Sequence, residues 1–358
     1  MTLEACPFPS SKYIRAVQLA APFNQLVEAV ASQPAWLLDT LQSVEATDTF
    51  TARLMALMRE VMARGESQRI HLGLHRSDYM LHLPAPGAEV GLLQVELNTI
   101  AASFASISTK ATELHKFVLA RSPPALLGTV PENDAAKGLA RALVFAHRQY
   151  LKVRPHAATS GTATGPTGAP AEVPLAAPHE VRVLFVVQPG ERNTVDQRGL
   201  EYEVAEQSNA VGGAGGLPGG VSAGSQRVLC LRASLRDVAS RATVVTVAAS
   251  ALPPGPGGEG SDDGAYGGAS ATVDLLYLDG FEISVVYFRA GYSRRLREGP
   301  RAGGWVGRSM GRAWPHCSIA IVPPPFFSSD FLPPWPLSFA PLLFTMLNAK
   351  VRPNGLPQ

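Results

Sequence analysis

The segment VRVLFVVQPG, residues 181–190, constrains the fold more than any other stretch of this chain. It is short, almost wholly apolar and closed by Pro-Gly, which is typical of a strand buried on both faces. After it, ERNTVDQRGLEYEVAEQ predicts a loop entering a helix, and RVLCLRASLRDVASR predicts a strand leading into another helix. YLDGFEISVVYFRAGY predicts a hairpin with Asp279-Gly280 at its turn. Residues 181–292 are therefore expected to form an alternating α/β unit.

The N-terminal part is expected to be mainly helical. FNQLVEAVASQPAWLLDTLQSV and FTARLMALMREVMARG place apolar residues three and four positions apart, which predicts two or three packed helices. In the second segment, Thr49 is the expected N-cap and Gly65 the expected end. IHLGLHRSDYMLHLP predicts a strand, a loop and a short strand, whereas ATELHKFVLARS and AAKGLARALVFAHRQYLKV predict two more helices.

Changes in composition predict the division into domains. Residues 156–180 are rich in Ala, Thr, Gly and Pro and predict a flexible linker, and Gly-rich insertions near 211–224 and 253–268 are expected to be disordered. After Tyr292 the apolar period is lost, so the tail is either an authentic flexible tail or sequence appended by a faulty gene model. The predicted parts are 1–155 (helices and strands), 156–180 (linker), 181–292 (α/β domain) and 293–358 (irregular tail).

Charge, cysteine content and hydropathy argue against several classes of partner. The formal net charge is +2 with a pI near 8.5, which gives no reason to expect nucleic acid or an anionic membrane as a partner. The three cysteines are far apart and lack CxxC spacing, so neither a disulfide framework nor a zinc site is indicated. FLPPWPLSFAPLLFTML is interrupted by prolines and falls short of the ~20 residues that a span needs. No signal peptide is visible, and an intracellular protein is expected.

Two short stretches carry polar side chains suited to binding a carboxylate or a cation. In LGLHRSDYM, Arg76 lies near Asp78, and it either binds a carboxylate bidentately or forms a local surface ion pair. In GLLQVELNTIAASFASIS, the alternation predicts a strand with Gln94, Glu96 and Asn98 on one face. Glu96 and Asn98 either share a hard cation such as Mg²⁺ or lie on a solvated face.

A third stretch, QPGERNTVDQR, follows the buried strand directly. It combines acid, amide and guanidinium groups in one loop and first helical turn, namely Glu191, Arg192, Asn193, Asp196 and Gln197. Ligands bind at the carboxyl ends of strands in open α/β sheets, and this mixture suits a zwitterionic substrate. The alternative is a polar loop in which Asn193 caps the helix.

Together with VVYFRAGY, these stretches resemble the signature segments of eukaryotic-type glutathione synthetase. LGLHRSDYM, QVELNTIAASF, ERNTVDQR and VVYFRAGY occur in the family's order, and DTFTARL and FNQLVEAV match its early helices. The resemblance extends from about Ala21 to Tyr292. It implies a partial ATP-grasp-type fold with an inserted α/β substrate-binding domain, α/β in class, followed by an irregular C-terminal tail.

The resemblance also implies an activity. The family is an ATP-dependent ligase that joins γ-glutamylcysteine to glycine, using ATP as co-substrate and Mg²⁺ as cofactor. ATP phosphorylates the cysteinyl carboxylate, and the glycine amine then attacks the acyl phosphate. A homodimer in the cytoplasm is the implied state, with the plastid as an alternative location.

The residues that match the family's motifs carry implied roles. Arg76 would be the catalytic residue, at the dipeptide carboxylate where the acyl phosphate forms. Glu96 and Asn98 would be magnesium ligands, with Glu96 also close to the nucleotide phosphates. Ala101 stands where the family more often has serine, and Ala290 where it has aspartate. The implied dipeptide-binding residues are Arg76, Ile100, Ala101, Ala102, Ser103, Glu191, Arg192, Asn193, Gln197, Arg289, Ala290, Gly291 and Tyr292.

Segments that would correspond to the family's C-terminal half are missing from the sequence. No match occurs to its Gly-rich phosphate-covering loop, its adenine-binding segment or its later acidic magnesium ligand. We therefore expect a truncated or mispredicted form of the synthetase that does not turn over by itself. The alternatives are a non-catalytic dipeptide-binding fragment, a subunit partner of a full-length enzyme, and a gene-model product without function.

Overall fold

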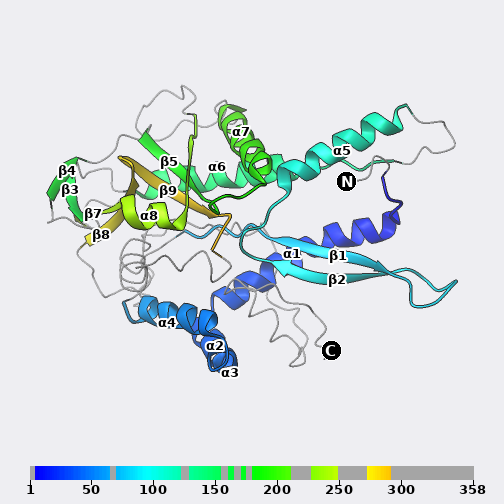
Figure 1. The fold of residues 1–358 in the computed structure, drawn as a ribbon, viewed down its shortest axis with the longest axis horizontal. Coiled ribbons are helices and arrows are strands. Elements are labelled where there is room, and N and C mark those ends of the chain that lie inside the picture. Colours follow the sequence, from blue (N-terminus) through cyan, green and yellow to red (C-terminus); the bar gives the residue numbers. More distant parts are fainter. Residues whose placement is uncertain are drawn as a thin grey trace, which may run out of the picture. The chain divides into compact units, whose positions relative to one another are not determined.

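The structure is a computed structural model that describes residues 5–64, 70–121, 129–154, 160–164, 171–174, 180–210, 227–248 and 272–291 (Figure 1). The described residues belong to two compact units. Unit 1 contains those within Met1–Met58 and Gly73–Ala136, and unit 2 those within Arg59–Leu72 and Lys137–Ala320.

Unit 1 begins with helices whose ends follow local capping rules. They are α1 (Ser10–Ala31), α2 (Pro34–Thr40), α3 (Gln42–Glu45) and α4 (Thr49–Arg64), the last of which continues into unit 2. Pro34 opens α2 because a proline in the first turn needs no backbone N–H. Asp48 caps α4 by accepting from the backbone N–H of Thr51 at 2.8 Å, so the prediction of Thr49 as N-cap is wrong by one residue. Gly65, its predicted end, lies outside the described residues.

The rest of unit 1 is a two-stranded antiparallel ribbon followed by a helix. The strands are β1 (Arg76–His82) and β2 (Gly91–Asn98), and the helix is α5 (Ala105–Leu119). RSDYM therefore lies in a strand, where a loop was predicted. The prediction of a strand in GLLQVELN and of a helix in ATELHKFVL is confirmed.

Unit 2 is built on one mixed sheet with the strand order β4-β3-β7-β8-β9-β5-β6. β5 pairs in parallel with both β6 and β9, and the remaining pairs are antiparallel. The strands are β3 (Ser160–Thr164), β4 (Ala171–Pro174), β5 (Val181–Val186), β6 (Cys230–Ala233), β7 (Ala242–Ala248), β8 (Thr272–Leu278) and β9 (Phe281–Phe288). The helices of this unit are α6 (Ala135–Val153), which begins in unit 1, α7 (Thr194–Ala210) and α8 (Leu235–Arg241).

One apolar cluster joins strands β5 to β9 to α8. Its buried members are Leu184, Val186, Ala233, Leu235, Val238, Ala242, Leu276, Leu278, Ile283 and Val286. Polar groups make the contact between β9 and α6. Tyr150 of α6 and Arg154, the residue after α6, bind Glu282, and His147 of α6 binds Ser284. The apolar sequence of β5 thus produces a strand almost fully buried, as predicted.

Several predictions about this unit are confirmed. The mixed α/β class holds, and the β8–β9 hairpin turns at Asp279 and Gly280, which both have positive φ, at 52° and 83°. Two short paired strands, β3 and β4, lie inside 156–180, where a flexible linker is predicted. The Gly-rich insertions and the tail from 292 onward lie outside the described residues, and the domain boundaries stay predictions. None of the helices in the described ranges is long and apolar enough to cross a membrane.

Candidate functional site

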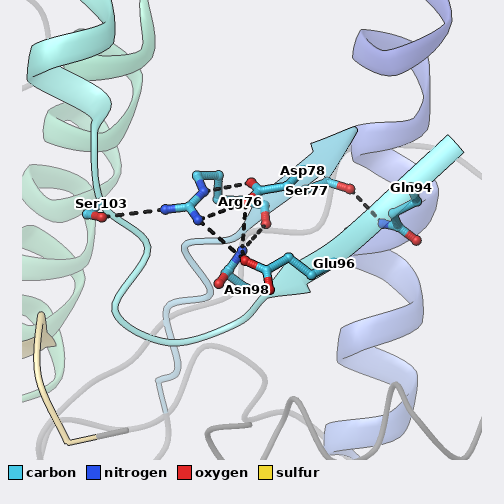
Figure 2. Close-up of polar contacts among 7 residues, drawn as sticks. All are labelled: Arg76, Ser77, Asp78, Gln94, Glu96, Asn98 and Ser103. Carbon is cyan, nitrogen blue, oxygen red and sulfur yellow. Dashed lines mark hydrogen bonds and ion pairs between the residues drawn. The ribbon is translucent and has the colours of Figure 1, made fainter. Parts of the chain in front are cut away.

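The first group of polar side chains lies at the end of the ribbon in unit 1 (Figure 2). We call it the Arg76 cluster, and its members are Arg76, Asp78, Glu96, Asn98 and Ser103. Arg76 opens β1 and Asn98 closes β2, and the two are cross-strand partners. Asp78 pairs with Glu96 in the same way. Residues two apart on a strand share a face, so the pairing gathers four of the five side chains on one side of the ribbon.

An irregularity in β2 sets the boundary of this cluster. The register passes from Asp78 opposite Glu96 to Tyr79 opposite Gln94, which leaves Val95 without a partner in the ladder as a bulge. Gln94 therefore points away from the cluster and donates a hydrogen bond to Ser77, as Figure 2 shows, with Nε2 and Oγ 2.6 Å apart. The prediction that Gln94 shares a face with Glu96 and Asn98 is wrong for this reason.

Arg76 is the centre of the cluster. Its Nε and Nη2 donate to the two carboxylate oxygens of Asp78 at 2.7 and 2.8 Å, a bidentate ion pair. Nη2 also lies 3.7 Å from Oε1 of Glu96, and Nη1 donates to Oγ of Ser103 at 3.4 Å. The hydrogen bonds that Arg76 donates to Asp78 raise the pKa of Arg76, and the negative charges of Asp78 and Glu96 raise it further. The edge of the guanidinium best suited to a bidentate ligand is thus already held by Asp78.

Asn98 connects the strands through its side-chain amide. Nδ2 donates to the backbone carbonyl of Arg76 and to Oε1 of Glu96, at 3.2 Å in each case, and lies 3.5 Å from Oδ2 of Asp78. Asn98 is buried, with 6% of its surface exposed. A buried amide with so many partners has a fixed position, which suits a residue that must hold a ligand in place.

The loop after β2 has a strained backbone. Ala101 and Phe104 adopt positive φ values of 53° and 74°, which non-glycine residues seldom do. Between them, Ala102 is buried, and Ser103 turns its hydroxyl to Arg76. The Phe104 ring lies under the Arg76 guanidinium at 5.5 Å from the ring centroid. The loop residues predicted to line a ligand, Ile100 to Ser103, therefore approach the Arg76 cluster through Ser103.

The donor atoms of the Arg76 cluster fit part of a magnesium site. Two carboxylates, of Asp78 and Glu96, and the amide of Asn98 lie on one face, and Mg²⁺ prefers oxygen ligands and keeps several waters or phosphates. Among the residues that the structure describes, no group of three or more His, Cys, Asp or Glu is arranged to hold a metal. The protein would therefore supply only part of a coordination shell. To coordinate the ion, Asn98 would have to present Oδ1 where Nδ2 now faces Glu96.

A second polar group lies in unit 2, at the carboxyl ends of the three parallel strands. We call it the Glu191 cluster, and its members are Glu191, Asp196, Gln197, Arg232 and Arg289. The first three belong to the loop after β5 and the first turn of α7, whereas Arg232 is in β6 and Arg289 follows β9. Arg289 extends the parallel pairing because its backbone N–H donates to the carbonyl of Val186 at 2.8 Å. Sheet topology, rather than sequence proximity, brings these side chains together.

Ion pairs and hydrogen bonds connect the whole Glu191 cluster. Nη2 of Arg289 lies 3.4 Å from Oε1 of Glu191 and 3.3 Å from Oδ2 of Asp196. Gln197 donates to Oε2 of Glu191 and accepts from Nη1 of Arg232 at 3.5 Å. Arg289, Asp196 and Gln197 are all buried. The Glu191 cluster is therefore a compact set of alternating charges in which Glu191 is more exposed than Asp196, Gln197 and Arg289.

The remaining predicted residues have unequal environments. In the loop before α7, Asn193 is half-buried and Arg192 is exposed. After β9, Ala290 is buried with 1% exposed, and Gly291 has a φ of 109°, which favours glycine. Tyr292 lies outside the described residues.

The sequence motifs include Asp78 as a neighbour of Arg76 and Asp196 among the polar residues of the third stretch, but they assign neither a role of its own, and they do not include Arg232. Asp78 is two residues from Arg76, a spacing that shares a strand face, so alternation could have indicated it once a strand was assumed. For Asp196, the signal that could have indicated a separate role is an acid in the first turn of a helix that follows a buried strand. No local signal marks Arg232, because its contact with Gln197 depends on the pairing of β6 with β5.

Comparison with known proteins agrees with these motifs. The family model "Eukaryotic glutathione synthase, ATP binding domain" matches residues 1–274, more than half of the chain. The chain belongs to the eukaryotic glutathione synthase family. The glutathione synthetases of Bos taurus and Dictyostelium discoideum are 29% and 28% identical over 297 and 282 residues, covering 81% and 78% of this chain. The chloroplastic glutathione synthetase of Solanum lycopersicum is 29% identical over 289 residues, 80% of this chain.

The chain matches only part of the length of its relatives in this family. The matches cover 46%, 45% and 39% of these three relatives, so the chain spans about half the length of the curated relatives it matches. A solved structure of a glutathione synthetase like-effector from Globodera pallida in apoform aligns with a TM-score of 0.45 and 15% identity, covering 88% of this chain and 61% of that chain. That similarity is too low to establish a shared fold.

Proposed function

We propose that this chain supplies the dipeptide-binding and part of the magnesium-binding residues of a glutathione synthetase, on a partial ATP-grasp-type fold. The reaction is the ATP-dependent ligation of γ-glutamylcysteine to glycine through an acyl phosphate. The observation that carries the proposal is the Arg76 cluster, where a fixed guanidinium, two carboxylates, an amide and a hydroxyl converge in motifs that match the family. Such a set suits a carboxylate that reacts beside a phosphoryl group, where several negatively charged oxygens are crowded together.

In unit 1, Arg76 and Ser103 would bind the cysteinyl carboxylate. Asp78 holds Nε and Nη2 of Arg76, so Nη1 and the Ser103 hydroxyl are the donors directed toward a ligand. Ala101 and Ala102 have small side chains, which would let the ligand come close to the backbone of this loop. Glu96 and Asn98 would hold Mg²⁺, which when bound neutralises the crowded phosphate oxygens of ATP. Arg76 would meanwhile keep the carboxylate oriented for attack.

In unit 2, the Glu191 cluster would bind the γ-glutamyl group, which carries an ammonium and a carboxylate. Glu191, whose side chain is 19% exposed, would accept from the ammonium. Arg289 would bind the carboxylate, and Gln197, with Asn193 from the loop before α7, would add amide hydrogen bonds. Arg192, Ala290, Gly291 and Tyr292 would complete this binding region. These assignments stay predictions from the family motifs.

Binding calorimetry tests the proposal directly. The chain is titrated with γ-glutamylcysteine and, separately, with ATP and MgCl₂. Glu96→Gln is expected to weaken Mg²⁺-dependent ATP binding by at least about ten-fold, since one anionic ligand is lost, and to leave dipeptide binding within about three-fold. Glu113→Gln, an exposed acid of α5 paired with Lys110, is the matched control and should change neither affinity. No heat with the dipeptide for the folded wild-type chain would refute the proposal.

A second candidate is a dipeptide-binding fragment or subunit partner that does not turn over. It is favoured by one observation, the match to only 46% of the length of the Bos taurus enzyme. ADP release by the chain with ATP, Mg²⁺, dipeptide and glycine separates the two functions: a rate dependent on both substrates establishes the ligase, and binding without release establishes the fragment. We propose a homodimer in the cytosol or plastid, and sedimentation tests the dimer.

A further inference from the structure

Arg289 has two carboxylate partners that differ in accessibility. Its side chain is 2% exposed, and Nη2 lies 3.3 Å from Oδ2 of Asp196 and 3.4 Å from Oε1 of Glu191. The Asp196 side chain is 5% exposed, whereas that of Glu191 is 19% exposed. A ligand that reaches the cluster from solvent therefore meets Glu191 and not Asp196.

The two acids are also held differently. Asp196 is fixed in the first turn of α7, beside the buried Gln197. Glu191 lies in the preceding loop, where its backbone N–H donates to the carbonyl of Gln188 at 3.2 Å and its side chain accepts from Gln197. A loop residue can turn toward a ligand at little cost, whereas an acid in a packed helical turn cannot.

A zwitterionic ligand would compete with Arg289 for Glu191. If the ligand's ammonium takes Glu191, the buried guanidinium loses one of its two negative neighbours, and a buried charge without a counter-charge is strongly destabilised. Asp196 is the neighbour that stays. The order Asp196, Arg289, ligand carboxylate, ligand ammonium, Glu191 would then alternate in sign at every step, which is the favourable arrangement for desolvated charges.

We infer that Asp196 is a positioning residue that holds Arg289 in place for the α-carboxylate of a γ-glutamyl group while Glu191 turns to the ammonium. The inference rests on the proposed function, because it assigns a ligand to the same cluster. Asp196 itself touches no ligand and acts through Arg289. Its role is therefore specific to ligands that carry the carboxylate.

The test compares two ligands by calorimetry on the full chain. One is γ-glutamylcysteine, and the other is 4-aminobutanoylcysteine, which lacks only the α-carboxylate of the γ-glutamyl group. Asp196→Asn is expected to lower affinity for the dipeptide by about ten-fold or more and for the analogue by less than about two-fold. Asp237→Asn is the matched control, since Asp237 completes the capping box of α8 with Ser234 and is not a member of the Glu191 cluster. It should leave the ratio of the two affinities unchanged.

Equal losses for both ligands would overturn the inference, because they would show a general structural role. A double-variant cycle gives a second measurement: in an Arg289→Gln background, Asp196→Asn should change dipeptide affinity by less than about two-fold, and a full ten-fold loss there also overturns it. Should Asp196→Asn not fold, Asp196→Glu takes its place, and failure of both to fold would assign Asp196 to stability alone. If the folded wild-type chain binds no dipeptide, the proposed function fails first. If it binds and Asp196→Asn binds equally well, only the inference fails.

Discussion

A buried histidine makes the stability of unit 2 sensitive to acid. His147 of α6 is 4% exposed, and its Nδ1 lies 2.7 Å from Oγ of Ser284 in β9. Ser284 donates its own hydrogen to the carbonyl of Arg182 at 3.0 Å, so Nδ1–H of the neutral ring is the donor in the first bond. Burial, and to a smaller extent the positive charges of Arg148, Arg182 and Arg154, lower the pKa of His147 from 6.5 to about 4.

The sign of the pH effect follows from that lowered pKa. In the unfolded chain His147 takes up a proton as the pH falls below 6.5, whereas in the folded chain it stays neutral until about pH 4. Between these values the unfolded state binds more protons, so stability falls with pH. At roughly 1.4 kcal/mol per pH unit, His147 alone is expected to remove about 3 kcal/mol between pH 7 and pH 4. His147 contributes its full stabilisation at pH values above 6.5, its pKa in the unfolded chain.

Urea unfolding at several pH values between 7 and 4 measures this loss. The control variant is His147→Asn, whose amide can still donate to Ser284 but does not titrate. We expect the wild-type free energy of unfolding to fall by about 3 kcal/mol more than that of the variant across this range. Parallel curves for the two proteins would refute the reasoning, because the other titrating groups are common to both.

Three other changes have defined outcomes. Arg154→Met leaves the fully buried Glu282, among the residues that the structure describes, with only the hydroxyls of Tyr150 and Tyr277, and should lower the free energy of unfolding in urea by about 3–5 kcal/mol. Adding Glu282→Gln should recover most of that loss, and no recovery would contradict a charge effect. Asp78→Asn frees the Arg76 guanidinium and should weaken dipeptide binding by about ten-fold in calorimetry, with unchanged affinity as the contrary result. Ala101→Ser adds the hydroxyl more usual in the family and should tighten that binding by about two- to ten-fold, and weaker binding would argue against a ligand at this loop.

Much of the fold could be predicted from local patterns. The apolar run of β5, the Asp279-Gly280 turn and the apolar period of α6 each specify their structure within a few residues. Local side-chain chemistry likewise indicated the motif residues of both clusters. These features depend on residues that are neighbours in the sequence, so a local sequence pattern is enough to predict them.

The features that could not be predicted depend on partners far apart in the chain. The bulge at Val95, which turns Gln94 away from the Arg76 cluster, has no mark in GLLQVELN. Glu282 looks like the solvent-facing residue of an alternating strand, yet it is fully buried because Tyr150 and Arg154 approach from the end of α6, about 130 residues earlier. Likewise, Asp196 contacts Arg289 and Arg232 contacts Gln197 only because β5, β6 and β9 are side by side in the sheet.

The position of β9 in the sheet has a consequence for synthesis of the chain. β9 joins the β5–β6 pair to the four strands that end at β8, and it is the last of the seven to leave the ribosome. Until it emerges, the nascent chain can form two separate sheet fragments with exposed edges, and β5 must wait roughly a hundred residues for its second neighbour. Closure of the sheet and arrival of Arg289, the residue after β9, are then nearly simultaneous. A nascent chain therefore acquires Arg289, the buried guanidinium of the Glu191 cluster, only as the sheet becomes complete. The cluster is then incomplete for only a short time after the sheet has formed.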